Sequence, residues 1–362
     1  MQSLTNNKTG SSRNGAIDFL RFVFACVILV YHFHPIKTTI PGGYIAVEFF
    51  LLVSGYLAAG KADRTNIRSW GEVYRFLKHK LFSFYPAFLI AWVFSFIIKQ
   101  VCAPNGFSLT ECFWELMRSP WSVLMIRQAG VAMGEYFEWY LSAMMLSLIL
   151  IYPLLLKWRK GFTLMIAPFI FMGYCGYAVQ GVGNIAMTEE WTGLFFGGFY
   201  RGLATISLGC ICYAAAAKLR KIPFNRRGQA LLSILEAVGY LLVFGLIANT
   251  GRTTLDFTIV LILACCVTVT FSGKSLFPRL FKHRIFGWLG TLSLELYLNH
   301  AVVASILLLR FGNELEGIMS WQYLFVVYIA ASFVLTLAAH GLLKLLRKIF
   351  PAGRMMGWVL DK

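Results

Sequence analysis

Apolar residues occur along the chain in long runs that short polar segments separate. Runs of about twenty apolar residues, the length that crosses the ~30 Å hydrocarbon core of a bilayer, recur ten times. They predict transmembrane helices at residues 17–36, 43–60, 81–100, 138–156, 162–180, 194–217, 229–249, 255–273, 285–309 and 321–343. The pattern therefore predicts an all-α, polytopic membrane helix bundle of about ten transmembrane helices.

The composition of the chain agrees with this pattern. Of the 362 residues, 58% are hydrophobic and only 14% are charged, and the mean hydropathy is +0.68. A soluble fold could not bury that much apolar surface. We therefore predict a multi-pass protein of a cell membrane, either a bacterial inner membrane or a plasma membrane. Residues 1–350 are predicted to form one transmembrane domain, and residues 351–362 a short cytoplasmic tail.

The net charge of +17 would suit a protein that binds nucleic acid, so the positions of the charges decide its meaning. With the N-terminus in the cytoplasm, 25 of the 33 Lys and Arg residues fall in cytoplasmic segments and six fall on the other side, while Arg21 and Arg201 lie within spans. This asymmetry follows the positive-inside rule. It predicts that both termini are cytoplasmic, and it explains the charge by topology and contact with membrane lipid, without nucleic acid as a partner.

Arg21 and His32 lie in the first apolar run, where ionisable residues are costly and often mark a functional site. On a helix, residues with this spacing are offset by about 20° around the axis and lie roughly 16 Å apart along it. Both side chains are therefore predicted to share one face, with Arg21 nearer the cytoplasm and His32 deeper in the span. The alternative is an Arg that extends to the membrane surface and a buried His that bonds to a neighbour. A cleaved signal peptide is not expected, because Arg21 interrupts the run and no small-residue cleavage site follows.

Glu48, Arg201 and Glu236 are further ionisable residues within predicted spans. Glu48, in the second span, could orient His32 or accept a bond from a substrate hydroxyl, and the alternative is a hydrogen-bonded carboxylate at the membrane interface. Arg201 and Glu236 are expected to pair with each other structurally.

The segment from 101 to 137 is the only long connection on the predicted outer side. Its Trp114 and Trp121, beside several carboxylates, could stack on a sugar, or they could anchor the segment at the membrane surface. Cys102 and Cys112 fall in the same segment, where an oxidising compartment would permit a disulfide.

The ionisable residues belong to longer motifs. The first sixty residues contain Arg13-x4-Asp18-Phe-Leu-Arg21-x10-His32 and then Gly42-Gly-Tyr-Ile-Ala-Val-Glu48-Phe-Phe-Leu-Leu-Val-Ser54-Gly-Tyr56. Later segments contain Trp139-Tyr-Leu-Ser and Ser293-Leu-Glu-Leu-Tyr297-Leu-Asn-His300. From Arg13 to about Val303, the chain resembles the acyltransferase 3 family, the integral membrane O-acyltransferases that modify glycans of the cell envelope.

The resemblance implies an enzyme that takes an acyl group, usually acetyl, from cytoplasmic acyl-CoA and passes it to a hydroxyl of an extracytoplasmic or lipid-linked glycan. His32 would be the general base, because a neutral imidazole can take a proton from a hydroxyl. Arg21 would bind the donor, because a guanidinium binds phosphate or carbonyl oxygens. Glu48, where the family usually has Asp, would be a second catalytic residue. Arg13 is also expected to bind the donor.

Six further residues are expected to bind substrate or to line the passage through the bundle: Tyr31, Ser54, Tyr56, Trp139, Tyr297 and His300. Two of them have a structural alternative. Ser54, next to a glycine, could instead allow close packing of helices. His300 could instead be a buried histidine that bonds to a neighbour.

Two departures from the family pattern concern the donor and the acceptor. The usual pair of arginines three residues apart is replaced by Lys80 and Ser83 before Pro86, so Arg75, Lys78 and Lys80 are predicted to bind the donor phosphates. The alternative role for this basic run is to anchor the chain on anionic lipid. In the fourth span, Met144 and Met145 occupy a place where many relatives have Glu, which leaves the acceptor class open.

The sequence shows no zinc-ligand spacing and no dinucleotide or phosphate-loop motif, so no metal is expected. The other function that the ionisable spans could serve is transport, with the chain as a multi-span transporter or flippase of a cell-envelope precursor. Such a protein is expected to show repeat symmetry or broken helices in corresponding halves, and neither is evident along the chain.

Overall fold

The computed structural model describes residues 14–33, 37–101, 107–131, 138–305 and 320–349. Arg13, Cys102 and the predicted tail at 351–362 lie outside these residues, and so does the predicted pairing of Cys102 with Cys112. Within the described residues the regular structure is helical, apart from one isolated bridge between Trp191 and Phe196.

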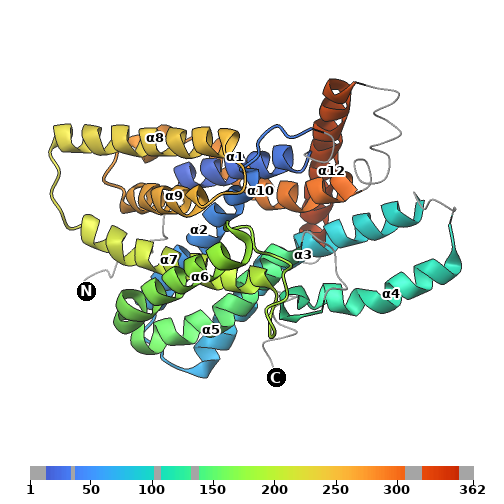
Figure 1. Ribbon diagram of the computed structural model, residues 1–362, viewed down its shortest axis with the longest axis horizontal. Coiled ribbons are helices and arrows are strands. Elements are labelled where there is room, and N and C mark those ends of the chain that lie inside the picture. The colour runs from blue at the N-terminus through green and yellow to red at the C-terminus, as the bar shows by residue number, and fades with distance from the viewer. Residues whose placement is uncertain (1–13, 34–36, 102–106, 132–137, 306–319, 350–362) are drawn as a thin grey trace, which may run out of the picture.

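The helices follow the apolar runs of the sequence. They are α1 Gly15–Tyr31, α2 Ala46–Arg64, α3 Trp70–Val101, α4 Leu109–Val123, α5 Trp139–Gly161, α6 Ala167–Val182, α7 Gly197–Leu219, α8 Arg226–Asn249, α9 Leu255–Ser272, α10 Arg284–Val303 and α12 Trp321–Ile349 (Figure 1). Each of the ten predicted runs coincides with one of them, and α4 lies in the long segment that is predicted to be on the outer side. Seven helical stretches among the described residues are long and apolar enough to cross a membrane. The number of crossings and the side of the termini stay predictions.

Local chemistry sets several helix boundaries. The side chain of Asn14 accepts bonds from the backbone at the start of α1, and Asn225 does the same at the start of α8. Gly183 and Gly273 end α6 and α9 with the positive φ angles that glycine adopts readily. Trp158 has non-helical angles of φ −144° and ψ 52°, so the helical stretch that includes α5 and α6 bends at this residue. Both α5 and α6 pack against α7.

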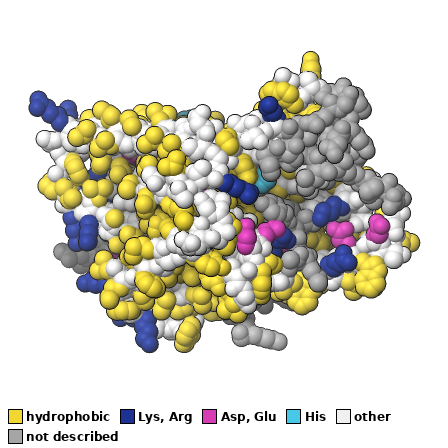
Figure 2. Space-filling model, viewed as in Figure 1, with side chains coloured by type: hydrophobic (Ala, Val, Ile, Leu, Met, Phe, Trp, Pro, Cys, Tyr) yellow, Lys and Arg dark blue, Asp and Glu magenta, His cyan; other side chains and the backbone are white. Residues whose placement is uncertain are grey.

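The bundle is built around α2. Of the 18 residues in the apolar stretch of Gly43–Arg64 that could span a membrane, 94% are buried. Helix α2 packs most extensively against α7, while α1 packs against α10. In the apolar stretches of α8 and α12, only 22% and 28% of the residues are buried. The remainder of their apolar surface is available to lipid, and apolar side chains cover much of the face in Figure 2.

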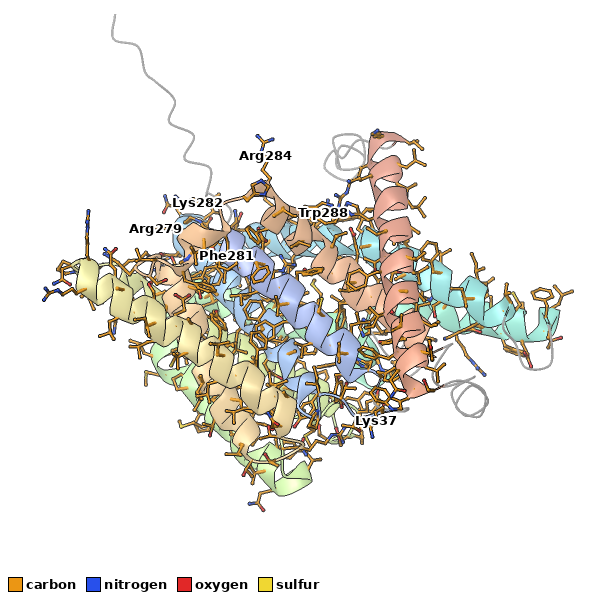
Figure 3. The ribbon with its side chains drawn as sticks, turned by 90° about the horizontal axis from the view of Figure 1, so that it is seen from above. Lys37, Arg279, Phe281, Lys282, Arg284 and Trp288 are labelled. Atoms are coloured by element: carbon orange, nitrogen blue, oxygen red, sulfur yellow. The ribbon has the colours of Figure 1, made fainter. Side chains whose placement is uncertain are left out.

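Charged side chains gather at the ends of the bundle. Lys and Arg lie along the left edge of Figure 2, where α7 ends and α8 begins. Arg279, Lys282 and Arg284 lie together at one end of the structure, and Lys37 lies far from them, beyond the other end of α1 (Figure 3). This separation is the one that the charge asymmetry of the sequence predicts for two sides of a membrane.

The contact between α2 and α7 depends on two glycines. A Cβ atom on Gly55 would overlap the carbonyl of Ile206, and one on Gly209 would overlap the carbonyl of Leu52. Because the two backbones touch here, small residues are required. The glycine beside Ser54 thus has the packing role that the sequence suggested for this motif.

We expect Gly55→Ala to lower the free energy of unfolding by about 1–3 kcal/mol, because the added methyl group must push apart two packed backbones. Thermal unfolding of the purified protein in detergent measures this loss. Gly173→Ala is the matched control, since a Cβ atom there has no neighbour within 4 Å and Ala favours a helix. An equal melting temperature for Gly55→Ala and the wild type would contradict the expected overlap.

Candidate active site

A cavity of about 760 Å³ opens among α1, α2, α3, α5, α10 and α12. Five cationic side chains line it, and we call it the cationic cavity: Arg21, Lys80, Arg284, Lys344 and Arg347. Its carboxylate, Glu295, is bonded to His340, with an oxygen-to-nitrogen distance of 2.8 Å. A net positive charge and this volume suit an elongated ligand that carries phosphates.

The cationic cavity reaches from the ends of the helices into the bundle. Arg284 is the first residue of α10 and Arg347 lies in the last turn of α12, whereas Tyr140 lies in the first turn of α5. Since α5 and α10 are predicted to cross the membrane in opposite directions, a ligand anchored at the charged ends of α10 and α12 would extend through the bundle to Tyr140.

Side chains around Tyr140 include the predicted residue Ser54 and also Met144. Ser54 lines the cationic cavity, and its hydroxyl lies 3.4 Å from the sulfur of Met144. The Tyr140 hydroxyl lies 3.8 Å from the same sulfur. Met144, noted as a departure from the family pattern, is therefore part of the cavity wall.

A pair of histidines lies beyond this wall. His32 caps the C-terminal end of α1, and its Nδ1 lies 3.2 Å from Nε2 of His300 on α10. The rings of His300 and Tyr297 are 5.8 Å apart, and those of Tyr297 and Tyr140 are 5.5 Å apart. A continuous series of ring contacts thus connects the histidine pair with the cationic cavity.

Arg21 also lines a neighbouring cavity of about 530 Å³, where it is joined by Arg64 and Arg220. The predicted residue Tyr56 lies here, stacked on Phe271 with ring centroids 3.8 Å apart, and its hydroxyl accepts a bond from Arg220 at 3.0 Å. The two cavities meet at Arg21, so this residue contributes to both.

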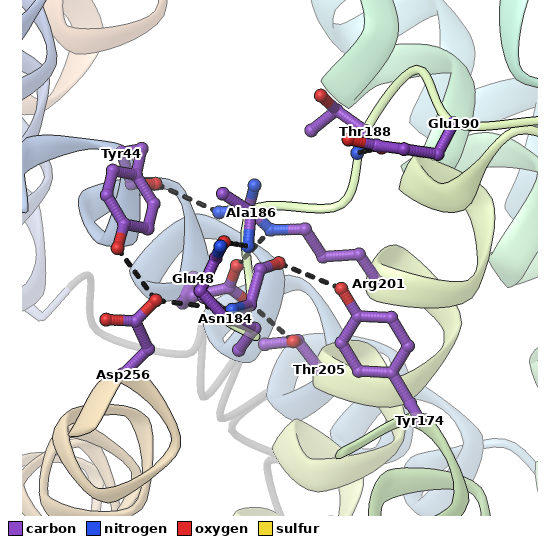
Figure 4. Close-up of polar contacts among 11 residues, drawn as sticks. Tyr44, Glu48, Tyr174, Asn184, Ala186, Thr188, Glu190, Arg201, Thr205 and Asp256 are labelled. Atoms are coloured by element: carbon purple, nitrogen blue, oxygen red, sulfur yellow. Dashed lines mark hydrogen bonds and ion pairs between the residues drawn. The ribbon is translucent and has the colours of Figure 1, made fainter. Parts of the chain in front are cut away.

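Glu48 and Arg201 form a fully buried ion pair, with Arg201 Nε 2.5 Å from Glu48 Oε1 (Figure 4). The second carboxylate oxygen accepts a bond from Thr205 at 2.5 Å. Arg201 also donates to the carbonyl of Tyr44 at 2.9 Å and lies 5.1 Å from the ring of Trp139. The expected pairing of Arg201 with Glu236 is wrong, because α2 rather than α8 brings the nearest carboxylate to Arg201.

Glu236 instead accepts a hydrogen bond of 2.5 Å from Thr270 on α9. This contact joins α8 to α9.

The ion pair belongs to a network that reaches the segment between α6 and α7. The Tyr44 hydroxyl donates to Asp256 at 2.7 Å, and the backbone N–H of Ile185 donates to the same oxygen at 3.2 Å (Figure 4). The ring of Tyr44 packs edge to face on Tyr31, 5.8 Å away, and Tyr31 packs in the same way on His32 at 5.3 Å. A series of contacts therefore connects Glu48 with His32, through Arg201, Tyr44 and Tyr31.

The other predicted donor residues lie at the edge of the site. Arg75 donates to Glu72 at 2.7 Å and lines a cavity of about 390 Å³ that also includes Lys80. Lys78 lies over the ring of Tyr74 at 5.6 Å and is not among the residues that line the cationic cavity.

Helix α4 presents aromatic side chains at the surface. Trp114 and Trp121 are 55% and 43% exposed, and Ser122 is the buried residue of this helix. Glu115 holds α4 to the end of α3 through Gln100 at 3.1 Å and Lys99 at 3.6 Å. The α3–α4 pair extends past the rest of the bundle at the right of Figure 1. Exposed tryptophans at this place are compatible with either predicted role, sugar stacking or membrane anchoring.

Three cationic residues of the cavity were missed by sequence reasoning. Arg284, Lys344 and Arg347 were assigned only to the topology of the membrane, because a charge at the end of a span has that function by default. Tyr140 was passed over although it follows Trp139 in one of the motifs. Among the described residues, no group of three or more His, Cys, Asp and Glu side chains could hold a metal ion.

Comparison with known proteins gives one match, to the sequence model of an acyltransferase domain, which covers residues 14–343. No curated protein and no solved structure matches the chain significantly.

Proposed function

Because the chain belongs to the acyltransferase 3 family of membrane acyltransferases, we propose that it transfers an acetyl group from cytoplasmic acetyl-CoA to a hydroxyl of an extracytoplasmic or lipid-linked glycan. The observation that supports this most directly is the cationic cavity, which extends from charged helix ends to Tyr140 and is connected by ring contacts to the histidine pair. The apolar helices support a multi-pass location, for which we propose a cell membrane.

The donor is proposed to enter with its phosphates at the cations and its thioester directed into the bundle. Phosphate oxygens form strong, charge-assisted hydrogen bonds with Lys and Arg. Lys80 occupies the wall of the cationic cavity, while the neighbouring Ser83 hydroxyl is bonded to the Lys80 carbonyl at 2.6 Å and brings no charge. Arg284, Lys344 and Arg347, from α10 and α12, would supply the positive charge that the Ser83 position lacks.

The reaction itself needs a base. As the glycan hydroxyl oxygen bonds to the thioester carbon, His32 takes the hydroxyl proton. The carbon–sulfur bond then breaks, and the proton passes to the thiolate, so the products are an ester and the free thiol of CoA. Arg21 would hold the donor from the same helix that carries His32, which fixes the separation of the two groups.

We expect Arg347→Gln to raise KM for acetyl-CoA by about three- to tenfold with little change in kcat, because one exposed, charge-assisted contact to the donor is lost. Incorporation of radiolabelled acetyl groups by membranes that contain the chain measures both constants. Arg279→Gln is the matched control, since Arg279 is exposed at the same end of the bundle but does not line the cationic cavity. An unchanged KM for Arg347→Gln would remove this residue from the donor site.

Mass spectrometry of envelope glycans from cells with and without the chain tests the proposed function. Loss of ester-linked acetyl groups in cells that lack the chain is the expected result, and it would also name the acceptor. The transport alternative gives a different result in proteoliposomes, where it requires movement of a glycan precursor without any acyl donor.

A further inference from the structure

Two histidines from distant parts of the chain meet between α1 and α10. Nε2 of His300 lies 3.2 Å from Nδ1 of His32, and the ring centroids are 4.9 Å apart. His300 is only 1% exposed, whereas His32 is partly exposed. The buried His300 ring is therefore placed to hold the partly exposed His32 ring in position.

Backbone carbonyls determine which ring nitrogens carry hydrogen. Nδ1 of His32 lies 2.9 Å from the carbonyl of Ile28, and Nδ1 of His300 lies 3.0 Å from the carbonyl of Leu296. A carbonyl oxygen can only accept, so each Nδ1 is the donor. In neutral rings, Nε2 of His300 then has a lone pair, and the one Nδ1–H of His32 is shared between the Ile28 carbonyl at 2.9 Å and this lone pair at 3.2 Å. The lone pair of His32 is on its own Nε2.

We propose that His300 is a positioning residue that holds the imidazole of His32 in the orientation needed to take a proton at Nε2, while the Ile28 carbonyl sets the tautomer of that ring. This inference rests on the proposed function. When the substrate hydroxyl gives its proton to His32 Nε2, the ring becomes positively charged and its Nδ1–H becomes a stronger donor to His300. His300 thus stabilises the charge that develops on the base, while it does not touch the reacting atoms itself.

The surroundings of His300 suit this role. Its bond to Leu296 comes from the preceding turn of α10, so one nitrogen is fixed by the helix and the other is directed to α1. The ring of Tyr297 packs 5.8 Å away. The His300 ring is buried and is held at both of its nitrogens. It therefore needs no reorientation when the His32 ring becomes charged, and this is what preorganisation requires.

A pair of substitutions separates positioning from simple packing. In His300→Gln, the amide can reach the place of Nε2 and accept from His32, whereas in His300→Asn the shorter amide reaches only the place of Nδ1. We expect His300→Asn to lower kcat about 10- to 100-fold, as the loss of a hydrogen bond to a charged group predicts. We expect His300→Gln to retain most of kcat, and neither variant to change KM for acetyl-CoA more than twofold.

The assay is incorporation of radiolabelled acetyl groups from acetyl-CoA into the glycan fraction of membranes, per folded molecule as judged by size-exclusion chromatography. Val302→Ala is the stability control, because it removes buried volume from the same helix and should leave kcat unchanged. Equal kcat values for the Asn and Gln variants would overturn the positioning role. Wild-type membranes that incorporate no label would overturn the proposed function, and with it the role of His300.

Discussion

Replacement of His32 by Ala is expected to lower kcat for acyl transfer at least about 100-fold, because general base catalysis typically contributes factors of 10² to 10⁴. The imidazole is the group at the histidine pair whose Nε2 can take the hydroxyl proton, and Ala cannot replace it. The effect should appear in kcat, with KM for acetyl-CoA nearly unchanged, since His32 is not among the residues that line the cationic cavity. Label incorporation at saturating acetyl-CoA measures it.

His283→Asn is the matched control for this experiment. His283 lies outside the pair and accepts a bond from the backbone at the start of α10, a role that Asn fills well. This variant should keep wild-type kcat. Near-wild-type transfer by a folded His32→Ala protein would contradict the assignment of His32 as the base.

Replacement of Arg201 by Met is expected to lower the free energy of unfolding by about 3–5 kcal/mol, because it leaves the carboxylate of Glu48 buried without its cation. Thr205 can still donate to one oxygen but cannot balance the charge. Thermal unfolding in detergent measures the loss. Arg226→Gln, at an exposed position on α8, should change the unfolding free energy by less than about 0.5 kcal/mol.

The same pair tests the predicted catalytic role of Glu48. The double variant Glu48→Gln/Arg201→Met should be more stable than Arg201→Met alone, because no unpaired charge remains. If Glu48 acts mainly by holding Arg201 and Tyr44 in place, kcat per folded molecule should fall only mildly in Glu48→Gln. A loss as large as that of His32→Ala in a fully folded Glu48→Gln protein would instead support a direct part in the reaction.

The elements of the fold were largely predictable from the sequence. Length and apolar character locate each helix, because a span needs about twenty apolar residues whatever it packs against. The contacts of Gly55 with Ile206 and of Gly209 with Leu52 were not predictable in the same way. They depend on which helices become neighbours, and hydropathy carries no information about neighbours.

The candidate site was predictable only in part. Arg21 and Lys80 stood out, one as a charge within a span and the other through a motif, and both line the cationic cavity. Arg284, Lys344 and Arg347 looked like ordinary charges at helix ends. Packing of α10 and α12 beside α1 and α3 brings them to the same cavity.

The sequence by itself determined that this chain is a helical membrane protein of the acyltransferase 3 family, and it predicted that Arg21 and His32 share one face of the first helical run. Both follow from local quantities, the hydropathy of a segment and the fixed angle between residues of a helix. Only the tertiary structure decided that His32 meets His300 and that Glu48 pairs with Arg201. These partners lie 268 and 153 positions apart, and contacts across such separations arise only when the packing of whole helices brings their faces together.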